Sequence, residues 1–225
     1  MRIAKGKLYA ILTGDVVGSS KLKGKARVTL VRAMKETSTE LRENFGGLVP
    51  FDVDIFRGDS WQLVVTDPAQ SLRIGLFFRA SVRARMRSKK VDTRVAIGIG
   101  TMDFLPGKNV SSGDGEAFRR SGTALESMSR TRRMALDCPV AISSGHAQAF
   151  DIVMRFVDVL ARGWTEKQAQ AVTGALREWT QEKIAKMWPG KEITQQAVAQ
   201  HLDRAGWNAV ENGLQFFERS VRALT

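Results

Sequence analysis

The chain has 225 residues, 43% of them hydrophobic, which is enough for one medium domain with a real core and a second small domain. Its formal net charge of +12 favours an anionic partner such as a nucleotide or a nucleic acid. The single cysteine, Cys138, excludes an intrachain disulfide and a CxxC metal site. No stretch reaches the roughly 18 uncharged apolar residues that a membrane span needs, and the N-terminus leads into a strand rather than a signal peptide. We therefore expect a cytoplasmic protein with no membrane partner.

Residues 1–150 predict a mixed α/β (α+β) domain. Hydrophobic alternation, helical periodicity and turn residues give the following order: a strand at 7–13, a helix at 23–45, a hairpin of strands 49–56 and 61–65, a helix from 67 to about 88, and a strand at 91–99. A helix at 115–129 and a short strand at 140–143 follow. The β-α-β-β-α-β order is that of ferredoxin-like palm domains.

Residues 151–225 predict an all-α domain joined to the first by a linker helix. Helices are expected to begin after Thr165, Thr180 and Thr194, because threonine is a favoured N-cap, and Pro189-Gly190 separates the last two. This order resembles a helix-turn-helix with a slightly lengthened turn. The charge excess lies elsewhere, however. Residues 1–150 hold 25 Lys or Arg against 14 Asp or Glu, whereas residues 151–225 hold 10 against 9.

Two aspartates stand where chemistry is expected. Asp15 follows an apolar strand and precedes a turn that contains Gly18, and Asp59 lies in the predicted hairpin turn. Glycine lets backbone amides approach phosphate oxygens, and a helix start adds partial positive charge. Two carboxylates at one sheet edge would bind Mg²⁺ or Mn²⁺ together with substrate phosphates. Aspartate beside glycine also marks ordinary turns, so a structural role for both residues stays open.

These motifs resemble known families. The run Asp15-Val16-Val17-Gly18-Ser19-Ser20-Lys21-Leu22 is similar to the first metal-binding strand and phosphate loop of class III nucleotidyl cyclases, and Gly58-Asp59 is similar to their second metal aspartate. The chain resembles SatD-family proteins more closely, through Thr13-Gly14-Asp15, the hairpin residues Gly58, Asp59 and Gln62, and the C-terminal helix-turn-helix. The resemblance implies metal binding by Asp15 and Asp59, and nucleoside triphosphate binding by Val16, Val17, Gly18, Ser19, Ser20 and Lys21. It also implies a homodimer.

The chain departs from the cyclase pattern where the transition state would be stabilised. Ala117 stands near the expected asparagine and Ser121 near the expected arginine, with Arg120 one residue away as the catalytic candidate. A base-reading lysine is missing from the segment before Arg57. Without a positioned arginine, an anionic transition state loses a large electrostatic term. Whether the palm is catalytic is therefore open.

Two further sets of residues are candidates for contacts with anions. Basic residues crowd the end of the second helix, where a solvated face is the default interpretation and a polyphosphate or nucleic-acid patch the alternative: Arg79, Arg83, Arg85, Arg87, Lys89 and Lys90. Side chains expected to face outward from the recognition helix are the DNA-binding candidates: Gln195, Gln196, Gln200, His201 and Arg204. A helical dimerisation or lid module is the alternative for this tail.

The sequence thus favours a DNA-binding regulator whose palm domain binds or processes a nucleotide with a divalent metal. The alternative is an active nucleotidyl cyclase or nucleotidyltransferase that makes a cyclic nucleotide, with the helical tail regulatory. A third option is an inert palm that serves as an interaction scaffold.

Overall fold

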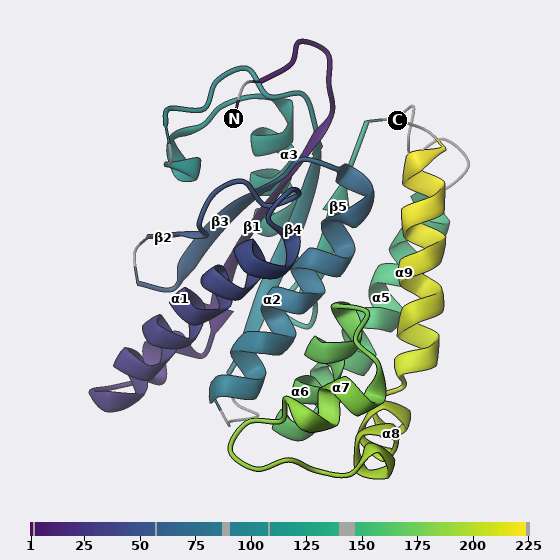
Figure 1. The fold of residues 1–225 in the computed structure, drawn as a ribbon. Helices are drawn as coiled ribbons and strands as arrows, with labels where there is room; N and C mark the ends of the chain where they lie inside the picture. The colour runs from purple at the N-terminus through teal and green to yellow at the C-terminus, as the bar shows by residue number, and fades with distance from the viewer. Residues whose placement is uncertain (2, 57, 87–90, 108, 140–146, 224–225) are drawn as a thin grey trace.

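The computed structural model describes residues 1, 3–56, 58–86, 91–107, 109–139 and 147–223. Its centre is a five-stranded sheet in the order β2 (Asp54–Phe56), β3 (Ser60–Val65), β1 (Tyr9–Val17), β4 (Asp92–Gly100), β5 (Met134–Asp137). All neighbouring strands are antiparallel except β4 and β5. Helix α1 (Lys25–Phe45) joins β1 to β2, and α2 (Ser71–Met86) joins β3 to β4 (Figure 1). This is the ferredoxin-like β-α-β-β-α-β arrangement, and the predicted α+β palm fold is confirmed.

Alternation along β1 explains how the sheet is covered on both faces. Ala10 and Leu12 belong to the core that includes α1 and α2, whereas Tyr9 and Ile11 pack with Ala117 of α3 (Glu116–Glu126). The strand runs four residues beyond its predicted end, because β4 pairs with it as far as Val17. The first aspartate motif therefore begins inside a strand, which fixes the position of its backbone.

The predicted strand at 49–56 shortens to β2, and the predicted strand at 140–143 lies outside the described residues. Strand β5, which we did not predict, closes the other side of the sheet. Among the helices that the structure describes, none combines the length and the apolar character that a membrane crossing requires.

The tail consists of α5 (Ala147–Gly163), α6 (Glu166–Leu176), α7 (Gln181–Lys186), α8 (Gln195–Arg204) and α9 (Trp207–Arg222). The three predicted N-caps are confirmed: the hydroxyl of Thr165 accepts from Gln168 N, that of Thr180 from Lys183 N, and that of Thr194 from Ala197 N. Helix α9 was not predicted. One continuous hydrophobic core joins β1 and α2 to α6 and α9, so the tail packs directly on the palm (Figure 1). The boundary at residue 150 stays a prediction.

Helix α2 lies between the sheet and the tail, and every residue from Ser71 to Ala84 is buried. Arg79 is 1% exposed and donates to both carboxylate oxygens of Asp92, each at 2.8 Å, and to Asp158 of α5 at 2.9 Å. Arg83 binds Asp92 and donates to the carbonyl of Trp164. The solvated face and the anion patch that we predicted here are both wrong for these two arginines, because α5 and α6 cover this part of α2. Residues 87–90 lie outside the described residues.

Electrostatics explains how these charges tolerate burial. Burial alone would raise the pKa of Asp92, but Arg79, Arg83 and the backbone amide of Thr93 together more than offset it, and this pKa lies below its ordinary value. Burial would likewise lower the pKa of Arg79, whereas Asp92 and Asp158 raise it. Both partners therefore stay charged at neutral pH, and the cluster joins the palm to the tail.

Candidate functional site

The predicted phosphate loop begins where β1 ends. Gly18 has a φ of +81°, in the left-handed region that glycine adopts without strain, and the 3₁₀ turn η1 (Ser19–Lys21) follows it. Within this turn Lys21 N donates to Gly18 O at 3.1 Å. The buried Ser19 hydroxyl donates to Oδ2 of Asp59 in the β2–β3 turn. The structure thus brings the phosphate loop and the second aspartate together.

Positive charge surrounds this loop. Lys21, Lys23, Lys25 and Arg27 are exposed, and the first turn of α1 contains no acidic residue. The Arg27 guanidinium lies against the hairpin turn, since a side-chain carbon at Gly58 would fall 2.5 Å from its terminal nitrogen. A helix start adds partial positive charge. The surroundings suit an anion such as a phosphate group.

Asp15 has a partner that the sequence analysis did not identify. It stands in β1 directly opposite Arg94 in β4. Nε of Arg94 donates to Oδ1 of Asp15 at 2.8 Å, and Nη2 donates to Oδ2. Both side chains keep about a quarter of their surface exposed, 26% for Asp15 and 28% for Arg94. The hydrogen bond to Asp15 is the main cause that raises the pKa of Arg94.

The donor set can be compared with the needs of a divalent cation. Mg²⁺ and Mn²⁺ bind through several oxygen ligands, with one or two of them from carboxylates. Both oxygens of Asp15 bind a guanidinium, and Asp59 accepts from Ser19. Within the part of the chain that the structure describes, no group of three or more His, Cys, Asp or Glu residues could hold a metal ion. In this arrangement the residues do not fit a divalent cation, and the metal site at Asp15 and Asp59 stays a prediction.

Arg120, the catalytic candidate, lies elsewhere in the chain. It stands on α3 and binds Glu116 at 2.7 Å and Asp137 of β5 at 2.6 Å. Asp137 pairs with Gly98 of β4, four residues and therefore about 13 Å along the strand from Arg94. Ser121 is buried, with its hydroxyl 2.8 Å from that of Thr13. Within one chain, the structure does not bring Arg120 to the phosphate loop, and Arg57 lies outside the described residues.

The predicted recognition helix corresponds to α8. Gln195, Gln196, Gln200 and Arg204 are exposed on it. His201 is half buried and stacks on Trp188, with ring centroids 5.5 Å apart. Burial, followed by the charges of Lys167 and Arg204, lowers the pKa of His201 and keeps the ring neutral at pH 7. Eight residues separate α7 from α8, more than the three or four of a compact helix-turn-helix.

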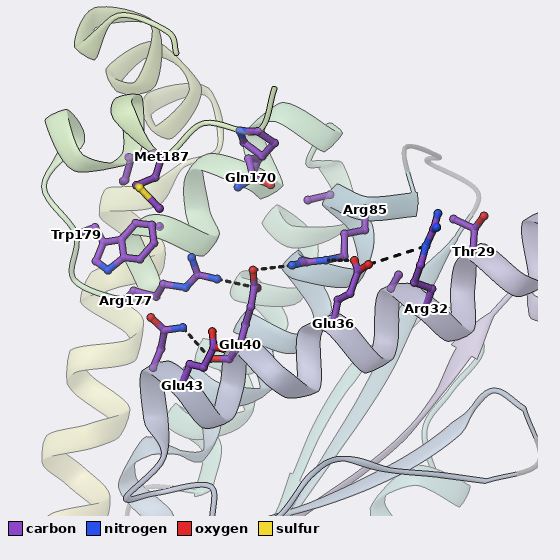
Figure 2. Close-up of a pocket in the computed structure, with 16 residues that line it drawn as sticks. Thr29, Arg32, Glu36, Glu40, Glu43, Arg85, Gln170, Arg177, Trp179 and Met187 are labelled. Carbon is purple, nitrogen blue, oxygen red and sulfur yellow. Dashed lines mark hydrogen bonds and ion pairs between the residues drawn. The ribbon is translucent and has the colours of Figure 1, made fainter. Parts of the chain in front are cut away.

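A groove of about 620 Å³ separates α1 from the tail (Figure 2). Glu36, Glu40 and Glu43 of α1 line one side, and Arg85 and Arg177 stand opposite. Glu40 binds Arg85 and Arg177, each at 2.7 Å, and Glu36 binds Arg85 at 3.2 Å. Burial lowers the pKa of Arg177. With Arg32, which pairs with Glu36, three arginines balance the three glutamates, so the described residues that line the groove carry no excess positive charge to hold an anion.

Fold and site together define a ferredoxin-like palm with a basic loop at the end of its first strand and a helical tail packed on its second helix. No protein-family model matches this sequence. A comparison with curated proteins gives no match either.

Three solved structures illustrate the likeness of fold. The guanylyl cyclase Cya2 has a TM-score of 0.41 and 12% identity over 63% of this chain and 78% of its own. The adenylyl cyclase CyaB from P. aeruginosa has a TM-score of 0.35 and 17% identity over 51% of this chain and 69% of its own. A bacterial light-regulated adenylyl cyclase has a TM-score of 0.35 and 15% identity over 57% of this chain and 42% of its own. These likenesses are too distant to carry an activity over to this chain.

Proposed function

We propose that the palm domain binds the phosphate chain of a nucleoside triphosphate at Val16–Lys21 and regulates a tail that contacts DNA. The observation that carries the nucleotide part is the loop itself. Gly18 has a left-handed backbone conformation, and Ser19 after it donates a hydrogen bond to Asp59. Four exposed cations lie within ten residues of Gly18. Backbone amides and cations together are the usual means of holding a phosphate.

The proposed regulator is the candidate that agrees with the SatD-family resemblance. A nucleotidyl cyclase of this fold is the second candidate. Among the described residues, Arg120 does not supply a transition-state arginine to this loop, because it binds Glu116 and Asp137. Incubation with each nucleoside triphosphate and Mg²⁺ or Mn²⁺, followed by mass spectrometry, separates the two candidates. A cyclic product that disappears in Asp59→Ala would establish the enzyme. The divalent metal predicted for either candidate requires a conformation in which Arg94 leaves Asp15.

The nucleotide part is tested by reversing one charge in the loop. We expect Lys21→Glu to weaken the binding of a fluorescent nucleoside triphosphate at least about 10-fold, since charge-assisted hydrogen bonds contribute roughly 1.5–3 kcal/mol. Lys35→Glu, the same charge change at an exposed position further along α1, should have little effect. Equal losses in both variants would indicate non-specific charge attraction. If wild-type protein binds no nucleotide at millimolar concentration, this function is wrong.

The DNA part rests on the exposed glutamines and Arg204 of α8, side chains suited to base edges and phosphates in the major groove. Because His201 packs on Trp188, it is the least accessible of the five candidates. Deleting the tail would be an ambiguous test, since α6 covers α2 and the truncated palm would expose its core. Point variants on the surface of α8 avoid this problem.

We expect Arg204→Glu to weaken DNA binding and to lower its dependence on salt concentration, because one phosphate contact is lost. Arg219→Glu on α9 makes the same charge change at another exposed site and is the matched control. Fluorescence anisotropy with random duplexes at several salt concentrations is the measurement. Identical behaviour of the two variants would contradict a role for α8.

A homodimer remains part of the proposal. Large apolar side chains are more than half exposed at Val28 of α1 and at Ile152, Phe156 and Val159 of α5. A second copy of the chain would cover one of these surfaces. Sedimentation analysis of the wild-type protein decides whether the dimer forms.

A further inference from the structure

We propose that Arg94 is the resident cation of the loop site, so that the palm binds nucleotide phosphates without a divalent metal. The guanidinium holds the carboxylate where a metal ion would otherwise neutralise it. This inference rests on the proposed nucleotide function and goes beyond it, because it assigns the charge chemistry of the site to a residue of the chain.

The position of Arg94 follows from the register of the sheet. Strands β1 and β4 pair continuously from Tyr9 opposite Gly100 to Val17 opposite Asp92. Arg94 and Asp15 are therefore direct cross-strand neighbours, a placement that favours opposite charges. The buried neighbours Thr93 and Val95 hold this part of β4 in place. The ion pair is thus fixed by backbone pairing and does not depend on a mobile side chain reaching across the surface.

The guanidinium keeps donors for a ligand. An arginine carries five N–H groups, and the pair with Asp15 uses one on Nε and one on Nη2. The side chain is 28% exposed, so the remaining N–H groups can reach solvent or a phosphate oxygen. A carboxylate without a partner would repel a phosphate, whereas Asp15 paired with Arg94 is neutral. Arg94 therefore removes a repulsion and offers hydrogen bonds at the same time.

The charge balance shows why no metal is needed. Lys21, Lys23, Lys25 and Arg27 follow Gly18 within nine residues, and Arg94 pairs with Asp15 three residues before Gly18. The carboxylates beside them are those of Asp15 and of Asp59, which accepts from Ser19. Five cations against two anions leave an excess of three positive charges before any ion binds. A metal would have to displace the guanidinium from both oxygens of Asp15 and then lie beside a free arginine. Repulsion between these two cations makes the exchange unfavourable.

The test uses full-length protein and two measurements. Binding of a fluorescent nucleoside triphosphate is measured with EDTA and with Mn²⁺, and Mn²⁺ binding without nucleotide is measured by electron paramagnetic resonance. We expect the wild-type protein to bind nucleotide with similar affinity in both buffers. Arg94→Gln should bind nucleotide at least about 10-fold more weakly in EDTA, because a charged hydrogen-bond donor is lost. The same variant should gain a Mn²⁺ site that Asp15→Asn removes.

Two further variants make the result specific. Arg94→Lys keeps the charge but not the paired geometry, so its nucleotide affinity should lie between those of the wild type and Arg94→Gln. Arg155→Gln removes an arginine that is 64% exposed on α5, and neither nucleotide nor Mn²⁺ binding should change. Circular dichroism melting curves confirm that each variant is folded.

The outcomes separate this inference from the proposed function. Nucleotide binding by the wild type that is 10-fold tighter with Mn²⁺ and depends on Asp15 would overturn the role of Arg94 and leave the nucleotide function intact. If the wild type binds no nucleotide in either buffer, the proposed function fails. The Mn²⁺ measurement then still decides the role of Arg94. A site gained in Arg94→Gln supports the inference, and no gain overturns it.

Discussion

Arg79→Ala is expected to lower the free energy of unfolding by about 3–5 kcal/mol, the range for breaking a buried ion pair on one side. Arg79 is 1% exposed, and its partners Asp92 and Asp158 are 7% and 2% exposed. Without the guanidinium, the buried carboxylates of Asp92 and Asp158 would lie near each other with less positive charge to offset their negative charges. Urea denaturation followed by far-ultraviolet circular dichroism measures the loss.

A milder variant and a control keep this prediction testable. If Arg79→Ala does not fold, Asp158→Asn removes one carboxylate charge with little change of volume, and it should still be clearly destabilising. Arg155→Ala breaks an exposed ion pair with Asp151 and should cost less than about 1 kcal/mol. A loss from Arg79→Ala as small as that from Arg155→Ala would show that the buried cluster does not hold the tail on the palm.

The pH dependence of stability reports on the same cluster. The pKa of Asp92 in the folded protein lies below its ordinary value, so the pair stabilises the protein above the ordinary pKa of an aspartate. This stabilisation is lost as the pH falls through the lowered value. Asp92→Asn should therefore flatten the acid side of the stability profile.

Local patterns predicted most of the fold. Alternation and β-rich runs located β1 to β4 but not β5, and three threonines marked the starts of three helices, because both signals act over a few residues. The pattern failed along α2. Its arginines look solvated in sequence, yet Arg79 binds Asp158, 79 positions away, and Arg73 binds Glu218, 145 positions away. Periodicity cannot reveal charged partners that are brought together only by packing of the tail.

The sequence likewise predicted some residues of the candidate site and missed others. Gly18 and Asp59 were found because each lies in a short turn motif, and the pairing of β1 with β3 brings these motifs together. Arg94 was missed because its partner is set by the register between β1 and β4, which the sequence does not specify. The available signal was an arginine at the polar end of β4, just before its apolar run from Val95. Arg120 was predicted from its position in a family pattern, but in the structure it forms ion pairs with Glu116 and Asp137.

Gly98→Ala is expected to destabilise the protein by about 3 kcal/mol, at the upper end of the usual cost of overpacking. Gly98 lies in β4 where α3 crosses the sheet. A side-chain carbon there would fall 2.3 Å from both Ala117 O and Ser121 N. Both atoms belong to the backbone, so the helix as a whole must move away, which would also break the hydrogen bond between Ser121 and Thr13.

Gly122 gives the matched control, because it lies in α3 and a side-chain carbon there would meet nothing within 4 Å. Gly122→Ala should stabilise the protein by about 0.5–1 kcal/mol, since alanine favours a helix interior over glycine. The same change from glycine to alanine is therefore expected to shift the free energy of unfolding in opposite directions at the two positions. Urea denaturation of both variants measures these shifts. If both variants destabilise equally, α3 is not packed on β4 through Gly98, and the placement of Ser121 and Arg120 away from the phosphate loop would lose its support.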